Sequence, residues 1–357
     1  MHLEQLRCRQ FRCLGDIDLP LASGLNVLRG GNAQGKTSIL EAILYAATSK
    51  SHRTTQDAEL VMHQHPDFHI FLKAQRHDRE VDLEAHWHKG AKRFKINGVA
   101  QPRVSDILGR IQVVFFSPED IALIKGSASQ RRRFLDMEIS QINPAYLQAL
   151  QQYRQALRQR NELLKAPRPD ATLMAVWDVQ LAAYGANLIA ARTDYVDALS
   201  NHAEAAHAAI AGLEKLTLQY RPNIAQDADY AAVLQRNLDQ DIRHRSTRHG
   251  PHRDDIEILI DGHPARHFGS QGQQRTAALA LKLAELEVMR AQLAEYPILM
   301  LDEVLSELDD ERAERLFGAI DDAVQCIVTT TESEPRSGRY AAHARNFIVQ
   351  GGQVEEA

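Results

Sequence analysis

Residues 30–37 read Gly30-Gly31-Asn32-Ala33-Gln34-Gly35-Lys36-Thr37. They fit G-x-x-x-x-G-K-[ST], a loop whose backbone N–H groups surround phosphate groups. Residues 25–28, with apolar Leu25, Val27 and Leu28, predict a short strand before the loop, and apolar residues at helical spacing follow it. A helix that begins at this loop points its N-terminus at a bound anion. The sequence therefore predicts a strand, a phosphate-binding loop and a helix.

The last residues of this motif have distinct expected roles. Lys36 would place its charge on the β- and γ-phosphates of ATP, and the Thr37 hydroxyl would bind Mg²⁺. We therefore expect ATP and Mg²⁺ as cofactors. The expected ATP-binding residues are Gly30, Gly31, Asn32, Ala33, Gln34, Gly35, Lys36, Thr37 and Ser38.

An ATPase also needs carboxylates near the phosphates, and residues 298–303 supply them. They read Ile298-Leu299-Met300-Leu301-Asp302-Glu303, a buried strand followed by two acids. Asp302 suits the magnesium site, and Glu303 suits a catalytic base for the attacking water. Because Asp302 follows Thr37 by some 265 residues, the two ends of the chain must share one sheet. The segment between them is then an insertion.

The pattern of the chain agrees with such an insertion. Residues 1–120 alternate apolar and polar positions in short strands at 3–9, 17–19, 69–74, 80–87 and 92–96, with a tight turn at Asn97-Gly98, and predict an antiparallel sheet. We expect 1–120 to form one lobe of an ATPase head, 121–242 an inserted helical arm, and 243–357 the second lobe of the same head. The predicted fold class is α/β, with a mixed sheet and an inserted α-helical domain.

The arm is predicted to contain two long antiparallel helices. Residues 133–165 lack glycine and carry leucines and tyrosines at spacings of three, four and seven. A break at 166–170 contains two prolines, and the same period resumes and continues to residue 211. At 1.5 Å per residue the second helix would be about 60 Å long.

Composition excludes several classes of protein. Hydrophobic residues make up 44% of the 357 and charged residues 25%, values typical of a soluble globular protein. Three cysteines without paired spacing favour a reducing cytosol, and we expect a cytoplasmic location. The first twenty residues lack the apolar core of a signal peptide, and no stretch of eighteen apolar residues predicts a membrane span.

Two short motifs connect the chain to a superfamily. Ser270-Gln271-Gly272-Gln273 opens a predicted helix, and Ser306-Glu307-Leu308-Asp309 follows the acid pair. They resemble the signature motif and the D-loop of ATP-binding-cassette ATPases. In that superfamily the signature loop of one subunit covers ATP held by the other. The resemblance implies a homodimer that forms on ATP binding, with Ser270, Gln271, Gly272 and Gln273 acting in trans and Ser306 and Asp309 in the D-loop.

Further strings narrow the resemblance. They are Ser51-His52-Arg53-Thr54, Ser117-Pro118-Glu119-Asp120, Arg131-Arg132-Arg133-Phe134-Leu135-Asp136 and His249-Gly250-Pro251-His252-Arg253-Asp254-Asp255. Over its whole length the chain resembles the RecF family of bacterial recombination-repair ATPases, which are similar to the heads of chromosome-maintenance ATPases. The resemblance implies binding to DNA near single-strand/double-strand junctions, and partnership with RecR and RecO in loading RecA at gaps.

The chain departs from the transporter-type pattern at two positions. Ser117-Pro118 stands where those ATPases carry the Q-loop glutamine, with Gln112 as a weak substitute. The strand expected to end in a switch histidine ends instead in Thr329-Thr330-Thr331. We expect Thr330 to sense the γ-phosphate.

The charge distribution supports a DNA-binding segment. The formal net charge is −5, but residues 125–168 carry nine Lys or Arg and three Asp or Glu, whereas 295–322 carry two and ten. We expect Arg131, Arg132 and Arg133 to contact DNA phosphates, with Arg53 as a further candidate. The histidine string at 249–252 is expected to line the nucleotide or DNA face, because Gly250-Pro251 disrupts the regular ligand spacing of a metal site.

Two other functions share the phosphate loop. The chain could be the nucleotide-binding subunit of a membrane transporter, although its inserted helical segment is longer than in such subunits. It could also be a P-loop kinase of small metabolites, which would leave the motifs at 270–273 and 306–309 unexplained. No membrane partner is expected for a DNA-binding ATPase, so stable membrane association would favour the transporter.

Overall fold

The computed structural model describes residues 1–77, 79–212, 214–304, 310–320, 322–331 and 344–357. The chain divides into two compact units, residues 1–120 with 282–357 and residues 121–281. Helix α9 (Gln271–Leu293) runs from the second unit into the first. Residues 243–281, which the sequence analysis assigned to the ATPase head, belong to the second unit, because strand β10 (Asp255–Ile260) pairs with β9 (Leu216–Arg221) of the helical segment.

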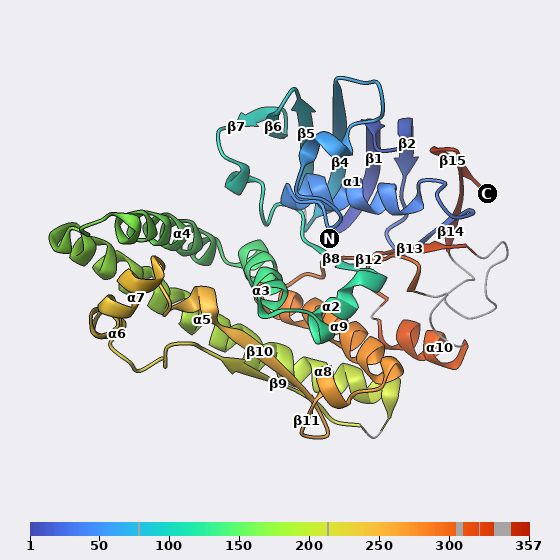
Figure 1. The fold of residues 1–357 in the computed structure, drawn as a ribbon. Helices are drawn as coiled ribbons and strands as arrows, with labels where there is room; N and C mark the ends of the chain where they lie inside the picture. The colour runs from blue at the N-terminus through green and yellow to red at the C-terminus, as the bar shows by residue number, and fades with distance from the viewer. Residues whose placement is uncertain (78, 213, 305–309, 321, 332–343) are drawn as a thin grey trace. The chain divides into compact units, whose positions relative to one another are not determined.

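The first unit contains an antiparallel sheet, as predicted (Figure 1). Its strand order is β2 (Leu14–Pro20), β1 (His2–Phe11), β4 (Asp67–Arg76), β5 (Arg79–His88), β6 (Ala91–Ile96) and β7 (Val99–Gln101). Leu6, Leu72 and Leu83 are opposite one another in register and fully buried, so the alternating pattern places one face in the core. Asn97 and Gly98 have φ of 49° and 77° at the predicted turn.

The second sheet of this unit carries the phosphate loop. Its order is β15 (Gln353–Glu356), β14 (Arg345–Gln350), β3 (Leu25–Arg29), β13 (Cys326–Thr330), β12 (Ile298–Leu301) and β8 (Val113–Phe116). All neighbours are parallel except β14 and β15. The prediction that β3 and β12 share one sheet is confirmed, with β13 between them.

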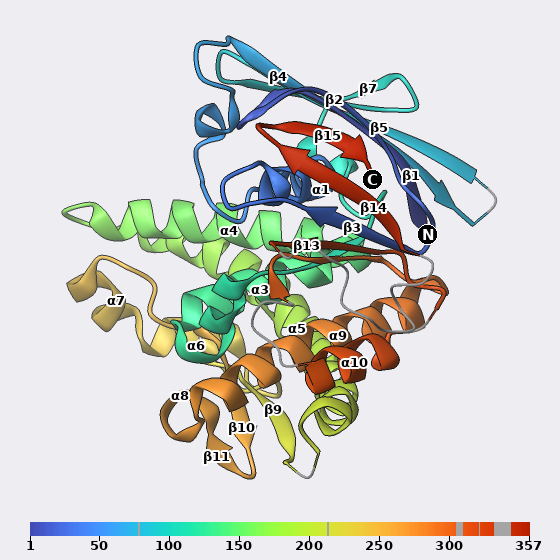
Figure 2. The same ribbon diagram turned by 90° about the vertical axis from the view of Figure 1, so that its right-hand side faces the viewer.

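Helix α1 (Lys36–Thr48) lies between the two sheets of the first unit (Figures 1 and 2). Its apolar residues Ile39, Leu40 and Ile43 are fully buried and belong to one core with side chains of both sheets. Helix α10 (Asp310–Ala319) and the short 3-10 helices η1 (Asp57–Leu60), η2 (Val104–Asp106) and η3 (Pro118–Ile121) complete the elements described in this unit and at its boundary. The core therefore fixes the helix that follows the phosphate loop.

The second unit is mainly helical. It contains α2 (Ala122–Lys125), α3 (Ala128–Ile142), α4 (Pro144–Lys165), α5 (Ala171–Ala211), α6 (Tyr230–Arg236), α7 (Leu238–His244), η4 (Pro251–Arg253) and α8 (Ala265–Phe268), and the sheet β11 (His263–Pro264), β10, β9. The single helix predicted over 133–165 is wrong, because the chain breaks between α3 and α4. Asn143 caps α4 by accepting a hydrogen bond from the Tyr146 N–H at 3.0 Å, and Pro144 occupies its first turn.

Helix α5 has 41 residues, in agreement with the predicted long helix. By length and composition alone, one of its 18-residue windows is apolar enough to cross a membrane. In the second unit, however, this helix has the pattern of a packing helix. Leu181, Leu188 and Leu199 are fully buried, and the buried Arg192 is paired with two carboxylates.

Candidate nucleotide site and basic segment

The phosphate loop connects β3 to α1 and depends on two of its glycines. A Cβ atom at Gly30 would lie 2.2 Å from the carbonyl oxygen of Val349, so the neighbouring strand excludes any side chain there. Gly35 has a φ of 115°, which L-residues rarely adopt. The two positions thus explain why the motif requires glycine.

Lys36 is held over this loop. Its side chain is 3% exposed, and Nζ donates hydrogen bonds to the carbonyl oxygens of Gly30 and Gly31, both at 2.8 Å. Nζ is also 3.4 Å from Oε1 of Glu303. The ammonium group is therefore fixed at the phosphate loop and close to the predicted catalytic base.

The two predicted magnesium ligands are in contact. Thr37 Oγ1 donates to Asp302 Oδ1 at 3.0 Å, and Thr329 Oγ1 donates to the same oxygen at 2.7 Å. Burial raises the pKa of Asp302, and the two hydroxyl hydrogen bonds oppose that rise. Adjacent ligands of an octahedral Mg²⁺ with bonds of 2.0–2.1 Å are about 2.9 Å apart. The separation of the Thr37 and Asp302 oxygens fits that geometry.

Glu303 has a backbone conformation uncommon for its residue type, with a φ of 52°. Its N–H donates to Thr329 Oγ1 at 2.8 Å, and its side chain is 36% exposed, so water can reach the carboxylate. Thr329 therefore contacts both acids. The sequence pointed to the neighbouring Thr330, whose carbonyl accepts a long hydrogen bond (3.3 Å) from the Gly30 N–H, and gave no reason to choose Thr329. The three threonines at 329–331 mark the site in the sequence. Only the alternation of side chains along β13 shows that Thr329 is the one that contacts Asp302.

The hairpin between β14 and β15 supports the phosphate loop and was also missed. Gly352 N–H donates to the Gln34 carbonyl at 2.9 Å, and Gly351 N–H donates to Gln34 Oε1 at 2.7 Å. Gly352 has a φ of 79°, and a Cβ there would lie 2.1 Å from the carbonyl oxygen of Cys13. The double glycine near the C-terminus was the available sequence signal.

The proposed substitutes for the Q-loop differ in position. Gln112 precedes β8 at the amino end of the parallel strands, where its carbonyl accepts from Ile298 N–H. Asp302 and the phosphate loop lie at the carboxyl end, so Gln112 is about 13 Å away along the strand, which rules it out as a γ-phosphate sensor. Ser117 follows β8 at the correct end, and its N–H donates to Asp120 Oδ2 at 2.8 Å.

Arg53 lies near a buried acid behind the loop. Glu41 of α1 is fully buried and accepts two hydrogen bonds from Arg12, at 2.9 and 2.8 Å, and one from Ser51 Oγ at 2.5 Å. Burial alone would raise the pKa of Glu41, but the hydrogen bonds from Arg12 and Ser51 outweigh it and the pKa is lowered. Arg53 is 4.0 Å from this carboxylate and its side chain is 48% exposed, so it remains a candidate for a ligand outside the core.

The signature motif lies in the second unit and forms the cap of α9. Ser270 N–H donates to Gln273 Oε1 at 2.7 Å, and Gln273 N–H donates to Ser270 Oγ at 3.2 Å. This reciprocal arrangement is a capping box. Ser270 and Gln271 are exposed and Gly272 is half-exposed. The D-loop residues Ser306 and Asp309 lie outside the described residues.

The arginines at 131–133 are not equivalent. Arg131 is buried, and its guanidinium makes a bidentate ion pair with Asp255 at 2.7 and 2.9 Å. It therefore holds α3 to β10 and is not available to DNA phosphates, contrary to our expectation. Arg132 is half-buried and donates to the Asp254 carbonyl at 2.7 Å, and Arg133 is exposed. The charge pattern of the sequence could not show which of the three arginines is buried, because Asp255, the partner of Arg131, lies 124 residues away.

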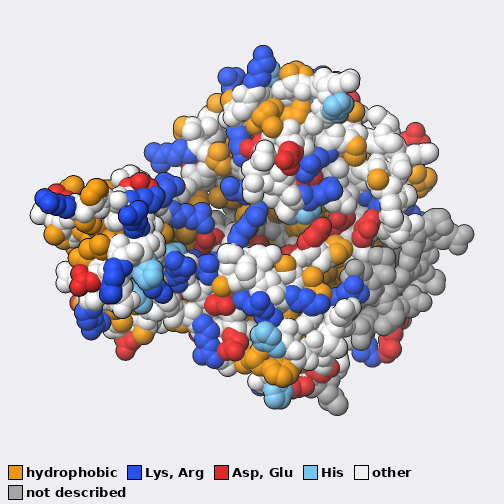
Figure 3. All heavy atoms as spheres, in the orientation of Figure 1, with side chains coloured by type: hydrophobic (Ala, Val, Ile, Leu, Met, Phe, Trp, Pro, Cys, Tyr) orange, Lys and Arg blue, Asp and Glu red, His pale blue; other side chains and the backbone are white. Residues whose placement is uncertain are grey.

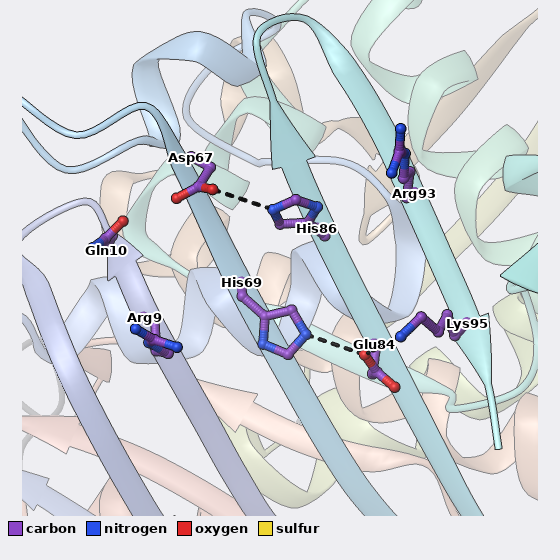
Figure 4. Close-up of a pocket in the computed structure, with 8 residues that line it drawn as sticks. All are labelled: Arg9, Gln10, Asp67, His69, Glu84, His86, Arg93 and Lys95. Carbon is purple, nitrogen blue, oxygen red and sulfur yellow. Dashed lines mark hydrogen bonds and ion pairs between the residues drawn. The ribbon is translucent and has the colours of Figure 1, made fainter. Parts of the chain in front are cut away.

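A mixed-charge concavity of about 520 Å³ lies on the open face of the antiparallel sheet (Figure 4). Arg9, His69, His86 and Arg93 are neighbours in register across four strands. Figure 4 shows His69 directed at Glu84 (3.2 Å) and His86 at Asp67 (3.4 Å). The lining therefore mixes three cationic side chains, Arg9, Arg93 and Lys95, with the two carboxylates of Asp67 and Glu84.

Comparisons with known proteins agree with this geometry. The family model "RecF/RecN/SMC N terminal domain" matches residues 2–343. A "DNA replication and repair protein RecF" of Listeria monocytogenes serotype 4b is 39% identical over 370 residues, covering 100% of both chains, and the protein of that name from Halalkalibacterium halodurans gives the same values. The solved structure of "the recombination mediator protein RecF-ATP in RecFOR pathway" is 34% identical with a TM-score of 0.92, covering 100% of this chain and 97% of that one. An "SmcHead bound to the C-winged helix domain of ScpA", 16% identical with a TM-score of 0.60 and covering 100% of this chain and 97% of that one, shares the fold.

The phosphate loop after β3 and the acid pair after β12 define the class of this protein, an ATPase of the SMC-like P-loop type. The similarity to RecF proteins over the full length of the chain identifies the family within this class. The chain belongs to the RecF family of DNA replication and repair proteins. The transporter and kinase alternatives are not favoured.

Proposed function

We propose that this protein is a slow, switch-like ATPase in which ATP and Mg²⁺ close a homodimer on duplex or gapped DNA and hydrolysis releases it. One observation carries the proposal. Lys36 Nζ lies 3.4 Å from Glu303 and Thr37 Oγ1 lies 3.0 Å from Asp302, although 265 residues separate Thr37 from Asp302 in the sequence. A structural loop would not need this convergence of charge at one edge of the sheet.

Each residue at this edge has a proposed role. The backbone of Gly30 to Gly35, Lys36 and Ser38 would bind the phosphates, and Thr37 and Asp302 would hold Mg²⁺. Bound Mg²⁺ would neutralise charge on the phosphate oxygens. Glu303 would accept a proton from the attacking water, and Thr329 would orient both acids. Thr330 remains a weaker candidate for a sensor.

The signature loop suits a contact in trans. Ser270 and Gln271 are exposed at the N-terminus of a long helix, and the nearby Phe268 is 72% exposed. A helix N-terminus favours anions, so this end of α9 could cover the γ-phosphate of ATP held by a second copy. We propose the same interface for Ser306 and Asp309. We propose that residues 1–120 and 243–357 act together as the two lobes of the ATPase head and that 121–242 act as the arm, with 243–281 contributing to the head's function while they pack in the second unit.

The proposed DNA contacts are Arg132, Arg133 and Arg53, because these side chains are at least partly exposed. The structural relative is named as a recombination mediator of the RecFOR pathway. By that relationship we propose RecR and RecO as partners, help in loading RecA at gaps, and a cytoplasmic location.

DNA affinity measured in four nucleotide states tests the proposal. We expect tight binding with ATP and Mg²⁺, and weak binding with ADP, with ATP alone or without nucleotide, because two basic segments on one duplex bind more phosphates than one. Lys36→Met should remove the nucleotide dependence, with Lys50→Met as a matched control at an exposed lysine just after α1. Equal affinity in all four states would contradict the switch.

A further inference from the structure

A cluster of arginines surrounds a cavity of about 180 Å³ in the second unit. It lies among α3, α4, α5 and the η4 turn, and its walls combine leucines with four guanidinium groups and one carboxylate, namely Arg132, Arg133, Arg154, Arg192 and Asp136. Figure 3 shows Lys and Arg side chains gathered over the part of this unit where α3 and α4 lie. The cavity is separate from the phosphate loop, which belongs to the first unit.

Arg192 fixes the inner wall. Its side chain is 2% exposed, and it donates to Tyr146 Oη (2.9 Å), the Pro251 carbonyl (2.7 Å), Asp254 Oδ2 (2.8 Å) and Asp136 Oδ1 (2.8 Å). A buried guanidinium with this many acceptors has one orientation. The wall is therefore built before any ligand arrives.

The positive charges of the cavity exceed what its carboxylate compensates. Asp136 accepts hydrogen bonds from Tyr146 Oη at 2.6 Å, Arg154 at 2.7 Å and Arg192 at 2.8 Å, so it is shared. Arg132 uses one of the five N–H groups of a guanidinium for the Asp254 carbonyl. Burial and the neighbouring Arg192 lower the pKa of Arg132, the direction expected where like charges are crowded.

His252, also in the wall, does not add to this charge. Its Nε2 lies 3.0 Å from the Thr247 carbonyl, an acceptor, so Nε2 carries the proton and Nδ1 accepts from Tyr153 Oη at 2.6 Å. Burial lowers the pKa of His252 to about 4, which leaves the ring neutral at pH 7. The excess positive charge thus belongs to guanidiniums, which bind phosphate oxygens in a bidentate geometry.

We propose that this cavity binds one phosphate group of a phosphate ester, with Arg132 and Arg154 donating to its oxygens and the rest of the ester in solvent. The cavity volume of about 180 Å³ fits a single phosphate group rather than a whole ligand, since pockets for small molecules measure roughly 300–1,000 Å³. That the phosphate belongs to DNA rests on the proposed function. That the cavity binds a phosphate group does not depend on that function.

The salt dependence of DNA binding tests the number of phosphates held. The variants are Arg132→Gln, Arg154→Gln and their combination, and Arg158→Gln is the control, an exposed arginine one turn along α4 that does not line the cavity. Each phosphate contributes about −0.9 to the slope of log affinity against log salt on duplex DNA. If the two arginines of each copy hold one phosphate, the dimer loses two phosphate contacts in the double variant, so the slope flattens by about two, and neither single variant flattens it by more than that. A flattening of about four in the double variant, two phosphates from each copy, would mean separate phosphates and overturn the shared site.

Two further measurements identify the source of the phosphate. If a 5′-terminal phosphate is bound, 5′-hydroxyl DNA reproduces the loss seen in the double variant, whereas an internal phosphate makes 5′-phosphorylated and 5′-hydroxyl DNA equivalent. Inorganic phosphate should raise the melting temperature of the full chain above that in chloride at equal ionic strength, and raise that of the double variant less, since both retain the phosphate loop. Equal phosphate stabilisation together with unchanged DNA binding would overturn the cavity as a phosphate site. Inorganic phosphate could stabilise wild type more than the double variant even if wild type bound no DNA. In that case only the proposed function would fail, and the phosphate site would stand.

Discussion

Glu303 is held in a conformation that its surroundings must impose. A glutamate with a φ of 52° is destabilised relative to ordinary backbone by about 1–3 kcal/mol unless contacts compensate. The Thr329 hydroxyl accepts from its N–H at 2.8 Å, and Lys36 lies 3.4 Å from its carboxylate. The position of the proposed base thus depends on a threonine of another strand.

Glu303→Gln should bind ATP with wild-type affinity and hydrolyse it about 10²–10⁴-fold more slowly, because the water loses its proton acceptor while Asp302 is unchanged. Single-turnover hydrolysis and equilibrium ATP binding separate the two effects. The control is Glu311→Gln, the same change at an exposed glutamate of α10. Unchanged turnover in Glu303→Gln would remove this residue from the chemistry.

Single residues were predictable where a motif fixes their spacing. Lys36, Thr37, Asp302 and Glu303 follow from two strings, and the structure brings them together. Thr329 did not follow, because a hydroxyl at a strand end has many common uses. Arg131 was placed on DNA because its partner Asp255 is remote in the sequence, and a buried ion pair leaves no local pattern.

At the scale of elements, the β14–β15 hairpin supports the phosphate loop through Gln34. Its turn lies more than 300 residues from that loop in sequence, and the hairpin donates through the backbone N–H groups of Gly351 and Gly352. Strand pairing of this kind is invisible to side-chain motifs. The break between α3 and α4 was readable, since Asn143-Pro144 is a common helix start, and the apolar period obscured it.

Gly352→Ala should weaken ATP binding although no side chain contacts the site. An alanine in the left-handed backbone region lowers the stability of the folded protein by about 1 kcal/mol. Overlap of its Cβ with the Cys13 carbonyl should lower that stability by about 1–3 kcal/mol more. Gly90→Ala is the matched control, because Gly90 has a φ of 88° with nothing within 4 Å of a Cβ. Chemical denaturation and ATP titration provide the comparison. Equal ATP affinity in the two variants would contradict the support from the hairpin.

At the scale of the whole molecule, the sequence located both ends of the chain in one α/β unit, and the sheet order confirms that β3 and β12 belong together. It did not foresee that residues 243–281 lie in the same compact unit as the arm, because β9 was not predicted and its pairing with β10 makes that connection. The central functional claim also belongs to this scale. The phosphate loop of one copy and the signature loop of another are proposed to form one ATP site.

Mixing two inactive variants tests this claim most directly. Lys36→Met lacks the phosphate-directed charge, and Ser270→Arg places a bulky cation at the exposed signature loop; each alone should hydrolyse ATP far below the wild-type rate. A dimer of one copy of each has one complete site, the phosphate loop of the Ser270→Arg copy with the signature loop of the Lys36→Met copy. Half of the dimers in an equimolar mixture are of this kind, so activity should return to at most about a quarter of wild type. No recovery, in a mixture shown by labelled subunits to form mixed dimers, would contradict a site shared between two copies.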